Sequence, residues 1–560
     1  MPDAPLVEVD DLTFRYRRGT EPAIRNVSLS IGAGEVLLVA GPSGCGKSTL
    51  IRALNGLIPH AYSGDLGGSV RIDGRSTTEL RLRELARLVG TVLQDPRKQL
   101  VASTIRGELA FGPENLGVPP DDIDRTVAAV TARAGIGHLL PRTTDELSGG
   151  ESQQVAIAGA LMLKPRLVVL DEPLANLDPK AAFRLLGLVR DLADAGTAVV
   201  LVEHRVEDAL EARPDRVLYL DDGTTRDLGS IEGFFEIADP DRVKLPFAVV
   251  LARTRAAGSR AVPPEPARPS RTEGEGSPPR LEWRGVEAGY DDRKVLHGVT
   301  GRLGARETVA VLGPNGSGKT TLFKAAIGLV PHAAGDVLVD GRSIDGRSVA
   351  ELASIFGYVF QNPSQMLFAP TVREELLFGP RNLGRDEGRY DDLVSGSLRR
   401  VGLDQEPDVE RRPPMTLSFG QQKRLGLAVA LALEPRTLVL DEPSAGQDHR
   451  SATAFMTEVQ RIAGLESVYF VTHDVDLALT YADRILLLRD GSIVADGPPL
   501  EVIRDRERWL ACNLRFTSLM DANARWADHT GRFLGAEALA TVIAALDPTD
   551  RGADHIGGAS

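Results

Sequence analysis

The same ordered set of short motifs occurs twice in this sequence, and this internal repeat constrains the fold more than any other feature. GPSGCGKST at residues 41–49 recurs as GPNGSGKTT at residues 313–321, an offset of 272 residues. Four further landmarks recur in the same order with offsets of 267 to 270 residues: LQDP as FQNP, LSGGE as LSFGQ, VVLDEP as LVLDEP, and the histidine of VEHR as that of VTHD. Chance does not produce five matches in one order with so little drift. The sequence therefore predicts two homologous domains in one chain.

Composition places the boundary between the two copies. Residues 251–280 are rich in Pro, Gly, Ser, Arg and Glu, which is typical of an extended tether. We therefore predict a first domain over residues 6–250 and a second over residues 281–510. The tail at 511–560 does not match the first copy, and one short helix is predicted in it over residues 536–546.

Each copy alternates predicted strands with predicted helices. EVLLVA at 35–40 and ETVAVL at 307–312 are short apolar runs, each followed by a glycine-rich turn and an amphipathic segment. RLVVLDEP and AVVLVEH in the first copy, and TLVLDEP and VYFVTH in the second, read as further buried strands between helices such as residues 181–195. Strands that alternate with helices indicate a parallel sheet covered on both faces. The predicted fold class is α/β.

Composition and charge narrow the class of protein. With 42% hydrophobic and 26% charged residues, the chain can form large cores. Its longest apolar runs, nine residues as in Val155–Leu163, are shorter than the ~20 that a membrane-spanning helix needs. Two cysteines cannot form a disulfide framework or a four-ligand zinc site, and a net charge of -13 disfavours a nucleic-acid surface. The N-terminus lacks the pattern of a secretory signal, so we expect a soluble protein in the cytoplasm.

The two glycine-rich loops both fit the pattern G-x-x-x-x-G-K-[ST]. In this pattern the backbone amides and a helix N-terminus point at phosphate oxygens, the lysine adds a cation, and the hydroxyl reaches Mg²⁺. A glycine-rich turn that merely precedes a helix is the alternative, and two matches in the same setting argue against it. We predict that a nucleoside triphosphate is bound by Gly41, Pro42, Ser43, Gly44, Cys45, Gly46, Lys47, Ser48 and Thr49, and by Gly313, Pro314, Asn315, Gly316, Ser317, Gly318, Lys319, Thr320 and Thr321.

Paired carboxylates follow one predicted strand in each copy. Asp171 and Glu172, like Asp441 and Glu442, lie where ligands gather in a parallel sheet, at the carboxyl ends of its strands. The aspartates are predicted to hold Mg²⁺, and the glutamates to orient or deprotonate the attacking water. Acidic residues that cap the next helix are the alternative.

Two other residue types gave weaker signals. A lone histidine after a strand is usually a satisfied surface or core residue, but His204 and His473 recur in register with the other motifs, which favours a hydrogen bond to the γ-phosphate. Cys45 lies in the first glycine-rich loop, where a helix N-terminus can lower the pKa of a thiol. A small tolerated residue is the simpler interpretation of Cys45.

Taken together, these motifs resemble the nucleotide-binding domains of ATP-binding cassette proteins over residues 6–250 and 281–510. The resemblance implies two tandem P-loop nucleotide-hydrolase domains, each with a parallel-sheet core and a helical subdomain, and the cofactors ATP and Mg²⁺. It also implies that the two domains pair head to tail within the chain. Each ATP would then contact the phosphate loop of one domain and the LSGGQ-like signature of the other.

The same resemblance assigns roles to further residues. Tyr16 and Tyr290 would stack on adenine, with ordinary strand aromatics as the alternative. Asp178 and Asp448 would connect the two sites. Gln94 and Gln361 would sense Mg²⁺ and the attacking water beside the surface that meets a membrane subunit. The signature contributions would be Ser148, Gly149 and Gly150 to the site of Lys319, and Ser418 and Gly420 to the site of Lys47. The metal ligands would be Ser48, Gln94, Asp171, Thr320, Gln361 and Asp441, and the catalytic groups Glu172, His204, Glu442 and His473.

Two departures from the family pattern bear on mechanism. Phe419 stands where the family usually has glycine, so the site that its signature completes is expected to be altered. Glu151 replaces the usual glutamine of the first signature, a milder change. Neither domain lacks its glutamate, lysine or histidine, so we predict that both sites hydrolyse ATP.

The segments behind the two glutamine motifs narrow the resemblance further. Residues 99–117 and 365–384 resemble the ATPases of energy-coupling factor importers, as does LSFGQQKR. This implies a translocase whose partners are a transmembrane coupling subunit and a small substrate-binding membrane protein, with the chain peripheral on the cytoplasmic face of the membrane. The cargo would be a vitamin, a vitamin precursor or a metal ion. The alternatives are the ATPase of a sugar or peptide importer, and a soluble tandem protein acting on ribosomes or nucleic acid.

Overall fold

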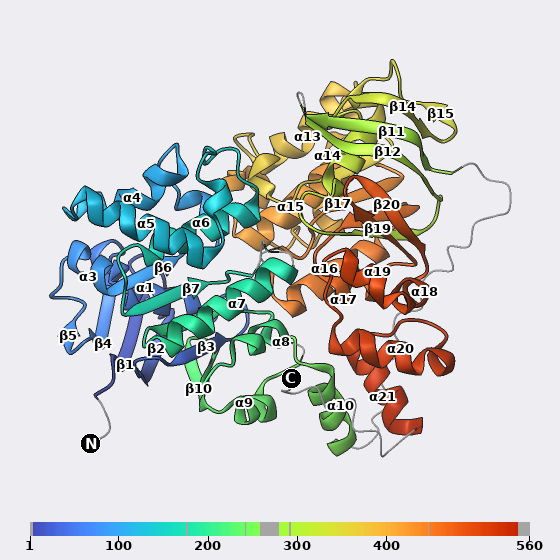
Figure 1. Ribbon diagram of the computed structural model, residues 1–560. Helices are drawn as coiled ribbons and strands as arrows, with labels where there is room; N and C mark the ends of the chain where they lie inside the picture. Colours follow the sequence, from blue (N-terminus) through green and yellow to red (C-terminus); the bar gives the residue numbers. More distant parts are fainter. Residues whose placement is uncertain are drawn as a thin grey trace. The chain divides into compact units, whose positions relative to one another are not determined.

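The computed structural model describes residues 4–174, 177, 179–240, 242–257, 279–290, 293–445 and 447–546 (Figure 1). The contacts divide the chain near Val249 into two compact units, which are described one at a time. Residues 258–278 of the predicted tether and residues 547–560 of the tail lie outside the described residues.

The first unit contains two sheets. A four-stranded antiparallel sheet has the order β2-β1-β4-β5, and a six-stranded sheet has the order β10-β9-β3-β8-β7-β6. In the larger sheet all neighbours from β9 to β6 are parallel, and β10 at the edge is antiparallel. The strands are β1 (Val7–Tyr16), β2 (Ile24–Ile31), β3 (Val36–Ala40), β4 (Gly64–Ile72), β5 (Arg75–Ser76), β6 (Val89–Val92), β7 (Leu167–Asp171), β8 (Ala198–Val202), β9 (Arg216–Asp221) and β10 (Thr224–Gly229).

The second unit repeats this arrangement. Its antiparallel sheet has the order β12-β11-β14-β15, and its six-stranded sheet the order β16-β17-β18-β13-β19-β20. Only β20 is antiparallel in the larger sheet. The strands are β11 (Leu281–Tyr290), β12 (Arg293–Leu303), β13 (Thr308–Leu312), β14 (His332–Val339), β15 (Arg342–Ser343), β16 (Phe356–Val359), β17 (Thr437–Asp441), β18 (Ser467–Val471), β19 (Arg484–Arg489) and β20 (Ser492–Gly497).

The predicted parallel sheets are confirmed, and the antiparallel sheets are an addition. In β1 and β11, buried residues alternate with exposed ones instead of forming continuous apolar runs. In the first unit, β1 and β2 pack onto one face of the parallel sheet in a core that includes Leu37, Val39 and Val200. The intervening residue Leu38 is buried as well but does not belong to that cluster. Because successive side chains point to opposite faces, the parallel sheet is buried on both.

Helices surround both parallel sheets, and three in each unit form a separate group (Figure 1). In the first unit α4, α5 and α6 contact one another, as do α13, α14 and α15 in the second, which matches the expected helical subdomains. The helices of the first copy are α1 (Lys47–Leu54), α2 (Leu57–His60), α3 (Leu82–Leu88), α4 (Ile105–Asn115), α5 (Pro120–Ala134), α6 (Gly149–Leu161), α7 (Pro179–Asp194), α8 (Val206–Ala209) and α9 (Ile231–Ile237). Helix α10 (Phe247–Ala256) crosses the boundary between the units, so the first residues of the predicted tether are helical instead of extended.

The second copy has a similar set of helices, continued by those of the tail. They are α11 (Lys319–Ala326), α12 (Val349–Ala353), α13 (Val372–Asn382), α14 (Tyr390–Arg400), α15 (Phe419–Leu431), α16 (His449–Arg461), α17 (Val475–Tyr481), α18 (Pro499–Arg504), α19 (Arg506–Ala511), α20 (Ser518–Thr530) and α21 (Ala536–Leu546). Among the described residues, no helix is both long enough and apolar enough to cross a bilayer.

The tail is more structured than its sequence suggested. The predicted helix over residues 536–546 is present as α21, but α20 precedes it and packs against both α18 and α21. Asn523 of α20 is fully buried, donates to the carbonyl groups of Leu519 and Leu534, and accepts from the Leu534 amide. Polar residues dominate the sequence of α20, and this buried asparagine shows how one of them is accommodated.

Candidate functional site

The glycine-rich loops follow β3 and β13 and are closed by their own lysines. Lys47 Nζ donates to the carbonyl groups of Gly41 and Pro42, both at 2.8 Å. In the second domain, Lys319 Nζ makes the corresponding bonds to Gly313 and Pro314 at 2.9 and 3.0 Å. Each loop therefore surrounds a buried ammonium group, while phosphate binding by the loop stays a prediction.

Each loop leads into a helix whose first amides have no side-chain cap. Gly46 and Gly318, the N-caps of α1 and α11, adopt left-handed conformations with φ of 102° and 97°. A Cβ on Gly46 would lie 2.5 Å from Ile24 Cγ2, so only glycine fits. Uncapped amides at a helix N-terminus, beside a lysine, suit the phosphate groups of a nucleotide.

Cys45 is buried in the first loop, 2% exposed. Burial raises the pKa of its thiol despite the nearby charge of Lys47, whose Nζ lies 3.9 Å from the sulfur. A buried thiol with a raised pKa is a poor nucleophile. The structure therefore favours the simpler interpretation of Cys45 as a small tolerated residue.

In the first domain, the predicted metal-sensing Gln94 and the predicted catalytic His204 both contact the carboxylate of Glu172. Gln94 Nε2 donates to Glu172 Oε2 at 2.6 Å, and His204 Nε2 lies 2.6 Å from Glu172 Oε1. These residues come from the ends of β6, β7 and β8, which are adjacent in the sheet. Parallel order thus brings together side chains that are far apart in sequence.

The two carboxyl groups at the end of β7 have opposite electrostatic surroundings. Burial, together with the negative charge of Glu172, raises the pKa of Asp171 to about 6. Burial would raise the pKa of Glu172 too, but the hydrogen bonds from His204 and Gln94 and the charge of Lys47 outweigh it, so that pKa lies below its usual range. Glu172 is therefore ionised and fixed in orientation at neutral pH.

In the second domain, two of the three predicted metal ligands, Thr320 and Asp441, are in contact with each other. Thr320 Oγ1 lies 3.0 and 3.1 Å from the two carboxylate oxygens of Asp441. Tyr358 donates its hydroxyl to Asp441 Oδ2 at 2.9 Å. Burial raises the pKa of Asp441, although both hydrogen bonds oppose the shift. A hydroxyl and a carboxylate side by side are oxygen ligands of the kind that Mg²⁺ prefers.

The predicted catalytic glutamate of the second domain, Glu442, contacts its histidine. His473 Nε2 lies 3.0 Å from Glu442 Oε1, and the His473 amide donates to Oε2 at 3.1 Å. Within the described part of the chain, no hydrogen bond joins Gln361 to Glu442, and Gln361 is exposed. Burial raises the pKa of Glu442. The two domains thus assemble the same groups with different contacts.

The two predicted adenine-stacking tyrosines have unlike environments. Arg52 donates to the Tyr16 hydroxyl at 2.6 Å, and its guanidinium group lies over the ring of Tyr62, 4.4 Å from the centroid. Tyr62 packs edge-on against Tyr16. Tyr290 of the second domain is instead 45% exposed. Stacking on adenine stays a prediction for both.

Both signature motifs begin a helix. Ser148 caps α6 and Ser418 caps α15, each in a capping box with Glu151 or Gln421 as the reciprocal partner. Glu151 also accepts a hydrogen bond from Arg142 at 2.6 Å. Phe419, in the first turn of α15, is 47% exposed.

The signature glycines lie in the first turns of α6 and α15. Gly149 and Gly150 form the first turn of α6, and Gly420 follows Phe419 in α15. Asp178, predicted to connect the two sites, lies outside the described residues.

Three polar residues near these sites, the buried Glu203 and Lys423 and the partly buried Tyr358, were not predicted from the sequence. Glu203 accepts hydrogen bonds from the amides of Leu174 and His204 at 2.8 and 3.1 Å. Lys423 donates from helix α15 to the loop behind Glu442, and Tyr358 holds Asp441 as described above. The sequence could have indicated Lys423, because it lies four residues before Leu427 and therefore on the same, buried face of an apolar helix.

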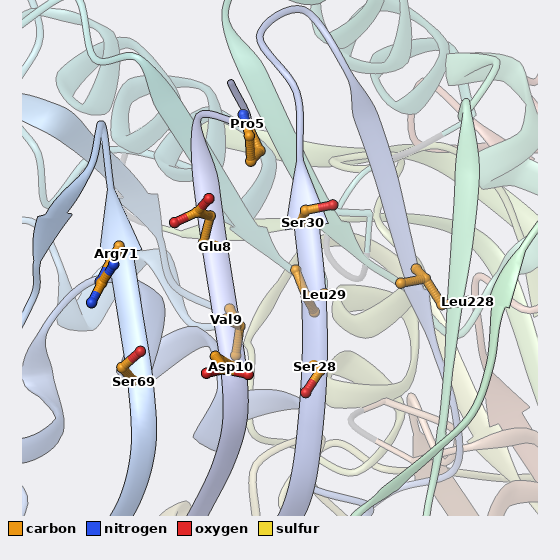
Figure 2. A pocket seen from close by; sticks show the side chains of 10 residues that line it. All are labelled: Pro5, Glu8, Val9, Asp10, Ser28, Leu29, Ser30, Ser69, Arg71 and Leu228. Atoms are coloured by element: carbon orange, nitrogen blue, oxygen red, sulfur yellow. The ribbon is translucent and has the colours of Figure 1, made fainter. Parts of the chain in front are cut away.

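A pocket of about 550 Å³ lies elsewhere, on the outer face of the first antiparallel sheet. Figure 2 shows its lining, with Glu8 and Asp10 from β1, Ser28 from β2 and Arg71 from β4. None of its lining residues was predicted as a site residue, and its charges of both signs select no ligand class. The phosphate loops and the carboxylates are therefore the better candidates for chemistry.

The fold and these loops define a tandem phosphate-loop ATPase. The ABC transporter family matches residues 24–175 and 296–445, which include both phosphate loops. The chain belongs to the ABC transporter family, as an ATP-hydrolysing subunit. The resemblance seen in its motifs is thereby confirmed.

Proteins similar over almost the whole chain carry only general names. One from Methanosarcina acetivorans, provisionally named an ABC transporter ATP-binding protein, is 35% identical over 91% of this chain and 89% of its own length. Another with the same provisional name, from Streptococcus mutans, is 33% identical over 93% of this chain and 96% of its own length. Among solved structures, cbiO1 from Clostridium perfringens, described as part of the ABC transporter complex cbiONQ, is 31% identical with a TM-score of 0.37, covering 43% of this chain and 96% of that chain.

Proposed function

We propose that this chain is the ATPase of an energy-coupling factor importer for a vitamin, a vitamin precursor or a metal ion. Its partners would be a transmembrane coupling subunit and a small substrate-binding membrane protein, and its place the cytoplasmic face of the membrane. The segments 99–117 and 365–384 carry the proposal, because they resemble that importer class and present exposed apolar side chains at equivalent positions.

These exposed side chains recur in both domains. Val101 and Phe111 are 63% and 50% exposed in the first domain, and Phe368 and Phe378 are 65% and 50% exposed in the second. The rings of Phe368 and Phe378 pack edge to face with centroids 4.8 Å apart. Large apolar groups exposed at corresponding places favour a docking surface for an apolar partner.

Carboxylates fix the loops that present these side chains. Glu108 accepts from the amides of Val101 and Ala102, both at 2.8 Å. Glu375 accepts in the same way from Phe368 and Ala369 at 2.7 Å. A rigid loop loses little conformational entropy on binding, which supports its use in docking.

The site residues support the following division of tasks in ATP hydrolysis. The loops of Lys47 and Lys319 would bind the phosphate groups, and Ser48 or Thr320 with Asp171 or Asp441 would hold Mg²⁺, which neutralises phosphate charge when bound. Glu172, ionised and in contact with Gln94 and His204, would accept a proton from water. In the second domain Glu442 and His473 would have the same roles.

Purification of the chain from membranes in mild detergent tests the importer class. Recovery of a transmembrane coupling subunit with a small membrane protein is the expected result. A periplasmic-type binding protein would indicate a sugar or peptide importer, and ribosomes would indicate a role outside transport; either would refute the proposal.

Substitution of the apolar surface tests the docking site itself. Phe368→Ser combined with Phe378→Ser should release the membrane partner, since each buried aromatic ring contributes roughly 1.5–3 kcal/mol. Phe183→Ser is the matched control, because Phe183 on α7 is equally exposed at 64% but lies outside the proposed surface. Equal loss of partner in both variants would contradict the assignment.

A further inference from the structure

Lys423 is a buried cation that the expected catalytic set does not use. It lies in α15, the helix that begins at the signature serine Ser418, and is 2% exposed. Its ammonium group donates to the carbonyl groups of Pro443 at 2.6 Å and Ala445 at 2.8 Å. Pro443 directly follows Glu442, so one side chain connects the signature helix to the loop behind the catalytic glutamate.

The backbone at Glu442 needs such support. Glu442 has a φ of 51°, the left-handed region that a residue with a side chain adopts only when its surroundings hold it there. Its amide donates to Val471, and the Ala445 amide donates back to the Glu442 carbonyl at 3.1 Å. Lys423 bonds the carbonyl groups of the same short turn.

Among the described residues of the first domain, no corresponding bond is present. Gln153 occupies the position equivalent to Lys423 in α6 and is 1% exposed. Neither amide atom of Gln153 has a hydrogen-bond partner among the described residues. There the amide of Leu174, in the loop after Glu172, donates to Glu203 instead, at 2.8 Å. The two domains therefore support the corresponding loops from different elements.

We propose that Lys423 is a positioning residue for ATP hydrolysis at the second domain, holding the turn that orients Glu442. This rests on the proposed role of Glu442 in activating water. The amine, bonded to two carbonyl oxygens, keeps the turn in the strained conformation that aims the carboxylate. Burial lowers the pKa of Lys423 to about 7, and either protonation state retains at least two N–H donors for the carbonyl groups.

Steady-state ATPase kinetics of the full chain test the proposal in two backgrounds. In Glu172→Gln, which leaves turnover to Glu442, Lys423→Met should lower kcat roughly 10–100-fold, with KM for ATP changed less than about 2-fold, because the oriented base is lost and nucleotide binding is kept. In Glu442→Gln, the same substitution should leave the residual turnover within about 2-fold. Gln153→Met in Glu442→Gln is the matched control, and because it removes no hydrogen bond, kcat should not change.

A second variant covers the case in which Lys423→Met does not fold. Lys423→Gln introduces the amide of the first domain, which can bond one carbonyl group at most through its shorter chain, and should give an intermediate kcat. Wild-type kcat in Lys423→Gln would overturn the proposal, as would a rise in KM at unchanged kcat or equal losses in both backgrounds. The variant Glu442→Gln alone tells these outcomes apart from an error in the proposed role of Glu442. If Glu442 does not activate water, that variant should retain full turnover.

Discussion

Glu203 gives the sharpest prediction about stability. It is a fully enclosed carboxyl group in the first domain, 2% exposed, with Glu172 as a negative neighbour. Burial and this neighbour raise its pKa from 4.5 to about 8, against the effect of the hydrogen bond from the Leu174 amide. The folded state therefore binds a proton at neutral pH that the unfolded chain releases.

The sign and size of the effect follow from this difference in proton binding. Between pH 4.5 and 8 the native state holds one more proton than the unfolded state, so stability is greatest below pH 4.5 and falls as the pH rises through 8. The slope is about 1.4 kcal/mol per pH unit, or about 2.7 kcal/mol between pH 5.5 and 7.5. For a domain of this size that corresponds to roughly 5–10 °C in Tm.

Calorimetry of wild type and Glu203→Gln at several pH values between 5.5 and 7.5 measures this contribution. Glutamine keeps an acceptor for the Leu174 amide but cannot titrate. The free energy of unfolding of wild type should therefore fall steadily relative to that of the variant as the pH rises. Glu114→Gln, on the exposed side of α4, is the control and should give a difference independent of pH. A constant difference for Glu203→Gln would refute a titrating, buried Glu203.

Four further predictions concern the two sites and the second core. Glu172→Gln and Glu442→Gln should each lower ATPase turnover, and a variant that retains full turnover would identify its site as non-contributing. Tyr358→Phe removes the hydroxyl bond to Asp441 and should raise the Mg²⁺ concentration for half-maximal ATPase roughly tenfold in Glu172→Gln, whereas Thr91→Val at the equivalent position should not. Arg280→Met leaves Asp340 and Glu466 without their buried partner and should destabilise the second domain by about 3 kcal/mol in denaturant unfolding, with Arg284→Met, an exposed pair, near neutral. Cys45 should react with a thiol reagent far more slowly than free cysteine, and a fast reaction that ATP prevents would contradict its buried, raised-pKa environment.

The parallel sheets and the residues at their strand ends could be predicted from sequence because both follow local rules. Five-residue apolar runs such as β3 and β17 are strands buried on both faces, and topology then places Gln94, Glu172 and His204 at one edge. The antiparallel sheet and α20 were missed because their polar residues, which turn toward solvent or find internal partners, obscure the apolar pattern. Spacing alone does not reveal which partner a buried polar residue will find.

The same limit explains why the two sites differ more than their motifs do. Both copies keep lysine, aspartate, glutamate and histidine, yet they differ at three equivalent positions. The first copy has Thr91, Gln153 and Glu203 where the second has Tyr358, Lys423 and Thr472. Each is a polar group at or near the core, and all except Gln153 bond a partner on another described segment. A buried polar group without a partner costs stability. A single exchange between the copies is therefore unfavourable: Gln153→Lys would bury a cation beside a loop already bonded to Glu203, and Thr472→Glu would bury a second carboxyl group beside Glu442. The two copies can come to hold their reacting groups differently only if such residues change together with their partners. We therefore expect a difference in ATP turnover between the two sites to depend on these buried residues, and not on the motifs that contact nucleotide.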